Sequence, residues 1–330
     1  MLNNEYNLVE DWGSAKGGLS TKRPMRDGYG EAMVEMARKN TKVVVLIADL
    51  LESLKLEEFK KEFPERLIEV GIQEQNMMGM AGGLALSGKI PFVNSFACFN
   101  PGRNWEQLRI SVCLTKNNVK VIGGHAGFGN GADGANQQSF EDMAITRVLP
   151  NMTVLAPVDY EQIKKAVWRM ADYDGPVYMR MTKPAREVMT TRTTPFEIGK
   201  AQVFREGKDV SVFACGSMVY EAMMAAKELA GTVEVEVINV HTIKPLDTEA
   251  MVKSARKTGK VVTAEEHSII GGLGSAVAEA LGENYPVPMR RVGMRDVFGE
   301  SGEPEELMKK YGLTKNEIIK EIKKLVNKNE

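Results

Sequence analysis

The chain reads Glu69-Val-Gly-Ile-Gln-Glu-Gln-Asn-Met-Met-Gly-Met-Ala-Gly-Gly-Leu-Ala85 and then Pro91-Phe-Val-Asn-Ser-Phe-Ala-Cys-Phe99. Two short β-rich runs, at residues 66–70 and 90–94, flank a small-residue pattern over 75–86 that is typical of a helix. Short, continuous apolar runs separated by helices are typical of buried parallel strands. This stretch therefore predicts a strand, a helix and a second strand of an open α/β sheet.

The same stretch places one carboxylate, Glu74, at the start of the apolar helix. Burying an ionisable acid beside Met, Ala and Gly costs several kcal/mol or raises its pKa. A helix-capping glutamate is the alternative for a residue at this position. We interpret Glu74 as a proton-handling acid that faces a flat ligand.

The alternation of strands and helices continues along the chain. Further strands are expected at 43–48, 119–122, 153–156 and 177–181, and further helices at 30–39, 56–62, 105–114 and 160–171. Residues 183–207, with scattered Pro, Thr and charge, form the best domain boundary. A more compact repeat of the pattern follows, with strands at 210–214, 233–238, 261–264 and near 289, and an amphipathic terminal helix after Leu313. The sequence thus predicts an α/β fold of two open doubly wound domains, with a tail at 1–21, domains at 22–188 and 207–330, and a linker at 189–206.

The composition of the chain argues against several classes of function. The chain has 330 residues, 43 Lys and Arg, and 44 Asp and Glu, so its net charge of -1 provides no general attraction for nucleic acid or membranes. Its three cysteines form no Cys-x-x-Cys pair and its three histidines are far apart, which argues against a zinc site. The start of the chain does not resemble a signal peptide, and no apolar run approaches the roughly 20 residues of a membrane span. We expect a soluble cytoplasmic protein.

Ligands of open α/β sheets bind beyond the carboxyl ends of the strands. The segments expected there carry Asp49 and Ser53, then Glu74, then Phe96, Phe99 and Arg103. A fourth loop, residues 123–138, is the longest and richest in glycine, and glycine lets the backbone approach a ligand closely. It presents His125, Asp133 and Gln137.

These motifs together match a family. Gly71-Ile-Gln-Glu-Gln-Asn76, Gly79-Met-Ala-Gly-Gly-Leu-Ala85, Ser95-Phe-Ala-Cys-Phe99 and the loop from His125 to Asp133-Gly resemble transketolases and their thiamine-diphosphate relatives. The resemblance begins near Pro24 and corresponds to the carboxyl-terminal half of a full transketolase. It implies a pyrimidine-binding domain followed by the transketolase C-terminal domain.

The resemblance also shows what this half lacks. The family holds Mg2+ and the cofactor diphosphate through Gly-Asp-Gly and a later Asn-Asn in the amino-terminal half, and the chain contains no Gly-Asp-Gly. The family pattern therefore implies a partner subunit that carries these motifs and the Mg2+, with no metal ligands in this chain. A thiamine diphosphate shared between two kinds of chain suggests an α2β2 assembly.

Cofactor roles carried over from the family fall on five residues. The glutamate that matches Glu74 protonates N1′ of the aminopyrimidine, which favours loss of the proton from C2 of the thiazolium. Phe99 is expected to stack on the aminopyrimidine, with Phe96 lining the site. Asp49 corresponds to an aspartate near the thiazolium ring. Arg103 is expected at the cofactor, although a salt-bridge or interface role is equally open for it.

Substrate roles fall on six further residues. His125 is expected to contact a phosphate or hydroxyl of the acceptor, and Asp133 a hydroxyl next to the carbonyl. Three further positions, Arg26, Ser53 and Lys183, match the family's phosphate contacts, but Lys183 replaces an arginine and cannot make its bidentate contact. Gln137 stands where transketolases usually carry histidine. Both departures from the family pattern concern residues expected to contact the acceptor sugar. The resemblance therefore specifies the cofactor better than it specifies the sugar.

The predicted function is transfer of a two-carbon ketol unit between phosphorylated sugars by the C-terminal subunit of a two-chain transketolase. A modified sugar, for example a sulfonated one, is the first alternative. The beta subunit of a 2-oxo acid dehydrogenase and a deoxyxylulose-phosphate synthase-like enzyme are nearby rivals, and a non-catalytic scaffold is a rival of another class. The loop Gly271-Gly-Leu-Gly-Ser275 lacks the third glycine of a dinucleotide motif and is interpreted as structural.

Overall fold

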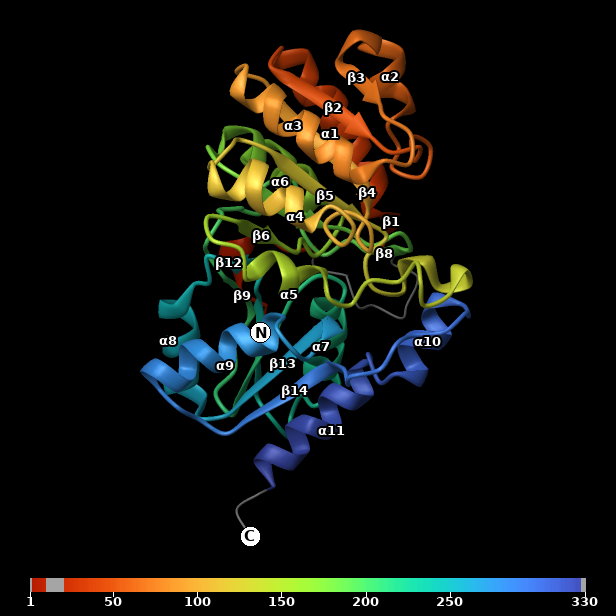
Figure 1. The fold of residues 1–330 in the computed structure, drawn as a ribbon. Helices are drawn as coiled ribbons and strands as arrows, with labels where there is room; N and C mark the ends of the chain where they lie inside the picture. The colour runs from red at the N-terminus through yellow and green to blue at the C-terminus, as the bar shows by residue number, and fades with distance from the viewer. Residues whose placement is uncertain (1, 10–20, 328–330) are drawn as a thin grey trace.

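A seven-stranded sheet forms the centre of the amino-terminal domain in the computed structural model, which describes residues 2–9 and 21–327 (Figure 1). Its strand order is β12-β6-β7-β5-β4-β2-β3, and every neighbouring pair is parallel except β12 against β6. The strands are β2 (Val43–Ile47), β3 (Leu67–Glu69), β4 (Ile90–Phe96), β5 (Lys120–Gly124), β6 (Thr153–Leu155), β7 (Val177–Arg180) and β12 (Thr242–Lys244).

Helices cover both faces of this sheet, because alternate strand residues are apolar on each face. Val43, Val45 and Ile47 of β2 pack with α1 (Met25–Lys39) and α6 (Tyr160–Asp172). Val44 and Leu46 pack on the other face, where α3 (Glu74–Leu86) lies. The remaining helical segments of this part are α2 (Glu57–Glu62), η2 (Pro64–Arg66), α4 (Trp105–Gln107), the π-helix η3 (Leu108–Leu114), the 3-10 helix η4 (Phe128–Asp133) and α5 (Asp142–Arg147).

The carboxyl-terminal domain repeats this plan on a five-stranded sheet of order β14-β13-β10-β11-β9, in which only β9 is antiparallel. Its strands are β9 (Gln202–Arg205), β10 (Val210–Ala214), β11 (Val235–Asn239), β13 (Val261–Ser268) and β14 (Met289–Met294). Its helices are α7 (Met218–Glu228), α8 (Thr248–Thr258), α9 (Leu273–Asn284), α10 (Pro304–Lys310) and α11 (Lys315–Val326). The predicted α/β class, with two doubly wound domains, is confirmed.

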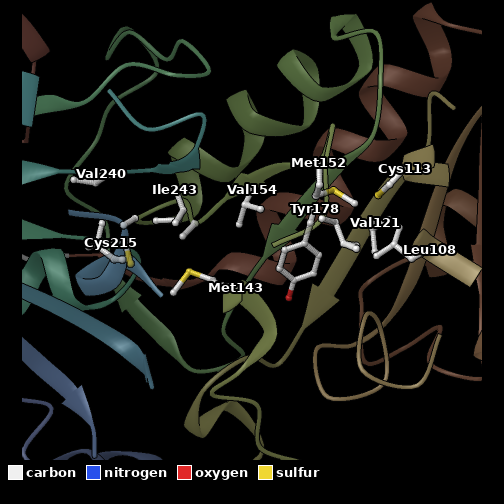
Figure 2. Close-up of a cluster of buried hydrophobic side chains, with 14 of the residues drawn as sticks. Leu108, Cys113, Val121, Met143, Met152, Val154, Tyr178, Cys215, Val240 and Ile243 are labelled. Carbon is white, nitrogen blue, oxygen red and sulfur yellow. The ribbon is translucent and has the colours of Figure 1, made fainter. Parts of the chain in front are cut away.

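The two domains share one hydrophobic layer. Figure 2 shows Val154 and Tyr178 of the first sheet in the same cluster as Cys215 and Val240 of the second domain, with Met143 between them. In addition, β12 belongs to the second half of the chain but completes the edge of the first sheet. The domains are therefore joined by a sheet edge and a common core, not only by a linker.

Short segments near the predicted boundaries also have structure. Residues 202–205 of the expected linker form β9, and β8 (Ala185–Glu187) pairs with β1 (Lys22–Pro24) in a two-stranded ribbon. In the expected tail, η1 (Asn4–Tyr6) lies against the second sheet, since the Asn3 amide donates to Phe204 O at 3.0 Å. Residues 10–20 of that tail lie outside the described residues.

Two predicted helices differ from the observed ones. The helix expected from Gly30 begins earlier, at Met25. Gly28 and Gly30 lie inside this helix, at positions where neighbouring backbone comes too close for a side chain. A Cβ at Gly30 would be 2.1 Å from Lys55 O, and one at Gly28 would be 2.8 Å from Tyr160 O. The helix expected over 105–114 is a short α-helix that continues as the wider turn of η3. None of the described helices is long and apolar enough to cross a membrane.

Candidate active site

Most of the candidate residues follow strands of the first sheet at their carboxyl ends. Along the order β7-β5-β4-β2-β3, Lys183 follows β7, His125 follows β5, Phe99 and Arg103 follow β4, Asp49 and Ser53 follow β2, and Glu74 follows β3. Parallel strands bring these ends to one edge of the sheet. The fold thus gathers segments that are far apart in sequence.

Glu74 is the first residue of α3, and only 1% of its surface is exposed. Its Oε1 accepts from the Ser95 hydroxyl at 3.2 Å, and its Oε2 accepts from Arg103 Nη1 at 2.8 Å. The small residues of α3 allow this burial: a Cβ at Gly82 would be 3.0 Å from Ser111 O, so α3 lies close against η3. A buried carboxylate with a charged donor can persist where an unpaired one would not.

Two asparagines that the sequence analysis did not single out support this site. Asn104 Nδ2 donates to the Glu74 carbonyl at 3.3 Å and to Asn100 Oδ1 at 2.9 Å. Asn100 Nδ2 in turn donates to Val93 O and Ile122 O, at 2.9 and 3.0 Å, and so ties the segment after β4 to β4 and β5. Both residues are fully buried. The sequence signal that could have identified them is their spacing: the two asparagines are four positions apart, in the segment that also contains Phe99 and Arg103.

Aromatic rings lie next to the ion pair of Glu74 and Arg103. The rings of Phe96 and Phe99 are 6.4 Å apart at an angle of 24°, and the Phe96 ring lies 4.3 Å from the His125 imidazole. Both phenylalanines are partly exposed. The Arg103 guanidinium lies over Phe99, with Cζ 4.3 Å from the ring centroid. The site therefore combines a buried acid with a flat apolar surface at which a heteroaromatic ring can stack.

Cationic groups gather around His125. Burial, and then the charges of Lys183 and Arg26, lower the pKa of His125 to about 3, so the imidazole is neutral near pH 7. Its Nδ1 is buried and without a hydrogen-bond partner among the described residues, as is the Nε of Arg26. Arg26 Nη1 donates to the Ser53 carbonyl at 3.2 Å. An unsatisfied guanidinium donor and an unpaired imidazole nitrogen beside an exposed lysine fit an anionic, hydroxyl-bearing ligand.

Within the described residues, none of the remaining candidates forms a hydrogen bond or ion pair with Glu74. Asp49 is exposed, and its amide donates to Glu69 Oε1 at 2.8 Å, a carboxylate that also accepts from Gly71 N at 3.0 Å. Asp133 is exposed at the end of η4. Gln137 is half-buried, and its backbone carbonyl accepts from Asn130 Nδ2 at 3.5 Å. Within residues 2–9 and 21–327, no group of three His, Cys, Asp or Glu side chains is placed to hold a metal ion.

Comparisons with known proteins agree with this fold. Residues 21–187 match the family model of the transketolase pyrimidine-binding domain, and residues 199–318 match that of the transketolase C-terminal domain. The 6-deoxy-6-sulfo-D-fructose transketolase subunit of Clostridium sp. (strain MSTE9) is 47% identical over 297 residues, which are 90% of this chain and 92% of that protein. An apulose-4-phosphate transketolase subunit of Phocaeicola vulgatus is 38% identical, over 92% of this chain and 97% of that one.

A solved structure of a split gene transketolase, described as an inactive beta4 tetramer, matches with a TM-score of 0.87 and 47% identity, over 92% of this chain and 98% of that one. The chain belongs to the transketolase family. Within that family it corresponds to the C-terminal section of a split transketolase, with the pyrimidine-binding domain ahead of the C-terminal domain.

Proposed function

We propose that this chain is the C-terminal subunit of a two-chain transketolase that transfers a two-carbon ketol unit from a ketose to an aldose. The observation that carries the proposal is the buried Glu74 carboxylate beside the partly exposed Phe99 ring, in a chain of this family. An acid and a flat apolar ring are what an aminopyrimidine requires: a partner for its ring nitrogen and a surface for its face. The residues present therefore fit thiamine diphosphate.

When bound, thiamine diphosphate supplies the carbon nucleophile that carries the two-carbon unit. Glu74 would share a proton with the pyrimidine nitrogen, Phe99 would stack on the ring with Phe96 beside it, and Asp49 would lie towards the thiazolium. Ser95 orients the carboxylate by donating to Oε1 at 3.2 Å. Arg103 donates to Oε2, so an aminopyrimidine that bonds to the same oxygen must share it with Arg103 or displace Arg103.

We further propose that a second chain completes the site and holds Mg2+ and the diphosphate. In the described part of the chain no three His, Cys, Asp or Glu side chains are placed together to hold a metal ion, and the solved structure of a related split gene transketolase is described as an inactive beta4 tetramer. Large apolar side chains are exposed on and next to α3 and η3, which pack together: Ile72, Leu86 and Leu114 are 67%, 75% and 70% exposed, and Met80 and Ile110 are 37% and 38% exposed. We call these five residues the apolar face. Apolar patches of this kind mark protein interfaces. The partner subunit would cover this face.

The sugar is proposed to carry an anionic group. Arg26, Ser53 and Lys183 would receive that group, while the neutral His125, Asp133 and Gln137 would contact hydroxyls. A phosphorylated sugar is our first candidate. A sulfonated sugar is the second, because a relative 47% identical is a 6-deoxy-6-sulfo-D-fructose transketolase subunit. A sulfonate, like a phosphate, is an anion that the Lys183 ammonium can pair with as a point charge.

The test is co-expression of this chain with the N-terminal section of a split transketolase, followed by a screen of phosphorylated, sulfonated and neutral sugars. Ketol transfer that requires both chains, Mg2+ and thiamine diphosphate supports the proposal. Absence of transfer with every ketose and aldose tested, in a complex that binds the cofactor, contradicts it. We also expect the isolated chain to bind thiamine diphosphate weakly by calorimetry, and tight binding would contradict the shared site.

A further inference from the structure

The glycine-rich loop that carries His125, Asp133 and Gln137 is attached to the C-terminal domain at its stem. The Phe128 amide donates to Glu266 Oε1 at 2.9 Å, across a sequence separation of 138 residues. The other end of the loop is joined to the same strand, β13, because the Ser268 amide donates to the Phe140 carbonyl at 2.8 Å. Both ends of the loop thus reach a strand of the other domain.

The Glu266 carboxylate accepts one hydrogen bond from this loop and one from the start of α7. It is 5% exposed, and its second oxygen, Oε2, accepts from the Ser217 hydroxyl at 2.5 Å. Gly127 has φ +64°, and a Cβ there would be 2.3 Å from Glu266 Oε1, so the loop backbone passes directly over the carboxylate. A carboxylate that accepts a backbone N–H in a buried site makes a strong hydrogen bond, and its loss leaves that N–H unsatisfied.

A buried ion pair contacts the backbone of Glu266 itself. Arg180, at the end of β7, donates to the Glu266 carbonyl at 3.0 Å and lies 3.0 Å from Asp142 Oδ2. Asp142 also accepts from the Tyr178 hydroxyl at 2.7 Å. The strand that carries Glu266 is therefore held against the first sheet.

The tip of the loop is held by a different segment of the C-terminal domain. The Gly302 amide donates to Gly131 O at 3.0 Å, and Gln138 Nε2 donates to Glu300 O at 2.9 Å. A Cβ at Gly131 would be 2.4 Å from Gly302 O, so the two backbones are in contact. Stem and tip contacts together leave the loop little freedom to move independently of the C-terminal domain.

We propose that Glu266 is a positioning residue for sugar binding: it holds the loop of His125, Asp133 and Gln137 in place, and so gives the C-terminal domain a direct part in the sugar site. This inference rests on the proposed function for the role of the loop. The Glu266 side chain accepts from Phe128 N and the Ser217 hydroxyl, and not from the segments that carry Glu74, Phe99 and Arg103; the loop meets the cofactor side where the His125 ring lies 4.3 Å from Phe96. Loss of Glu266 is therefore expected to weaken sugar binding and to leave cofactor binding unchanged.

The first experiment needs neither sugar nor cofactor. Hydrogen exchange of residues 126–134 is compared in the full chain for wild type, Glu266→Ala, Glu266→Gln and Glu265→Gln. Glu265 is the matched control, since its carboxylate accepts from Leu273 N and Gly274 N within its own domain. Faster exchange of the loop in Glu266→Ala, with protection kept in Glu266→Gln and Glu265→Gln, supports the inference. Unchanged exchange in Glu266→Ala overturns it.

The second experiment uses the reconstituted complex. In Glu266→Ala the KM for the sugar is expected to rise roughly tenfold, as for the loss of one charge-assisted hydrogen bond, while the affinity for thiamine diphosphate changes less than about twofold. Glu266→Gln, whose amide oxygen can still accept from Phe128 N, is expected to restore most of the loss. If Glu266→Ala does not fold, Ser217→Ala, which removes the donor to Oε2, is expected to raise the sugar KM in the same direction.

The two possible failures are distinguishable. A wild-type complex without ketol transfer refutes the proposed function, while the hydrogen-exchange comparison still tests the attachment of the loop. A wild-type complex with ketol transfer, in which Glu266→Ala leaves the sugar KM unchanged or loses cofactor affinity to the same extent, overturns the role of Glu266.

Discussion

Arg103 and Glu74 form an ion pair at the centre of the candidate site, with Nη1 of the guanidinium 2.8 Å from Oε2 of the carboxylate. The same guanidinium lies over the Phe99 ring at 4.3 Å. One flat group thus hydrogen-bonds to Glu74 and stacks on Phe99, the two contacts that the proposed function gives to the aminopyrimidine. The Arg103 side chain is 43% exposed, so it is free to leave this position without disturbing the core.

The ion pair predicts an energetic coupling between its two members. In urea unfolding, Glu74→Gln and Arg103→Ala together are expected to differ from the sum of the single changes by about 1 kcal/mol, since one partner is buried and the other is half-exposed. Arg109→Ala, at an exposed position of η3, is the matched control and should be additive with Glu74→Gln. Additivity of the Glu74 and Arg103 changes to within about 0.3 kcal/mol would show that the pair is not energetically coupled.

Lys183 is expected to determine the preference for charged sugars. Removing one cation beside the proposed anion site in Lys183→Ala should raise the KM for the anionic sugar by roughly tenfold, and the effect should shrink at high salt. The kcat/KM for a neutral sugar should stay within about twofold. Lys89→Ala is the control, because Lys89 is exposed before β4, at the opposite edge of the sheet. Equal losses for neutral and anionic sugars would refute the assignment.

His125 predicts a pH dependence of stability. Its pKa in the fold is about 3, lowered first by burial, whereas an exposed histidine titrates near 6.5. Between these values the unfolded chain binds the extra proton, so this histidine destabilises the fold as the pH falls, by about 2 kcal/mol at pH 5. His125→Gln should therefore lose less stability than wild type between pH 6.5 and 5 in thermal unfolding. Parallel curves for the two proteins would contradict the buried, neutral state of His125.

The apolar face predicts the contact surface for the N-terminal section. Leu86→Asp and Leu114→Asp place a charge on this face and are expected to weaken complex formation at least tenfold, because a desolvated, unpaired carboxylate is costly. Lys61→Glu on α2 is the control. Because α2 packs on α1, on the other face of the sheet, this change of charge is expected to leave assembly unaffected. Analytical ultracentrifugation of each variant with the N-terminal section measures this. Normal assembly of both aspartate variants would show that the interface with the N-terminal section does not include this face.

The central strands were predictable because each is a continuous apolar run, such as residues 43–47, that is buried on both faces. The ribbon of β1 and β8 and the edge strands β9 and β12 were not, since runs of three or four residues are strands only through their pairing partners. The start of α1 was missed because Gly28 normally weakens a helix, and here it serves close packing against Tyr160.

The candidate site, like the fold, could be predicted only in part. The residues after the strand ends could be chosen from the sequence, since parallel strands bring those ends together. The contacts of Asn100, Asn104 and Glu266 could not, because their hydrogen bonds join segments up to 138 residues apart and leave no local pattern. The roles of the candidate residues towards cofactor and sugar stay predictions.

The most direct test of the account is turnover of the reconstituted complex with Glu74→Gln. The amide keeps the size of the side chain and its contact to Ser95 but cannot act as the acid, so turnover should fall by at least about 100-fold. Light scattering should show the same assembly as wild type. Full turnover in the Glu74→Gln complex would contradict the claim that Glu74 activates the cofactor.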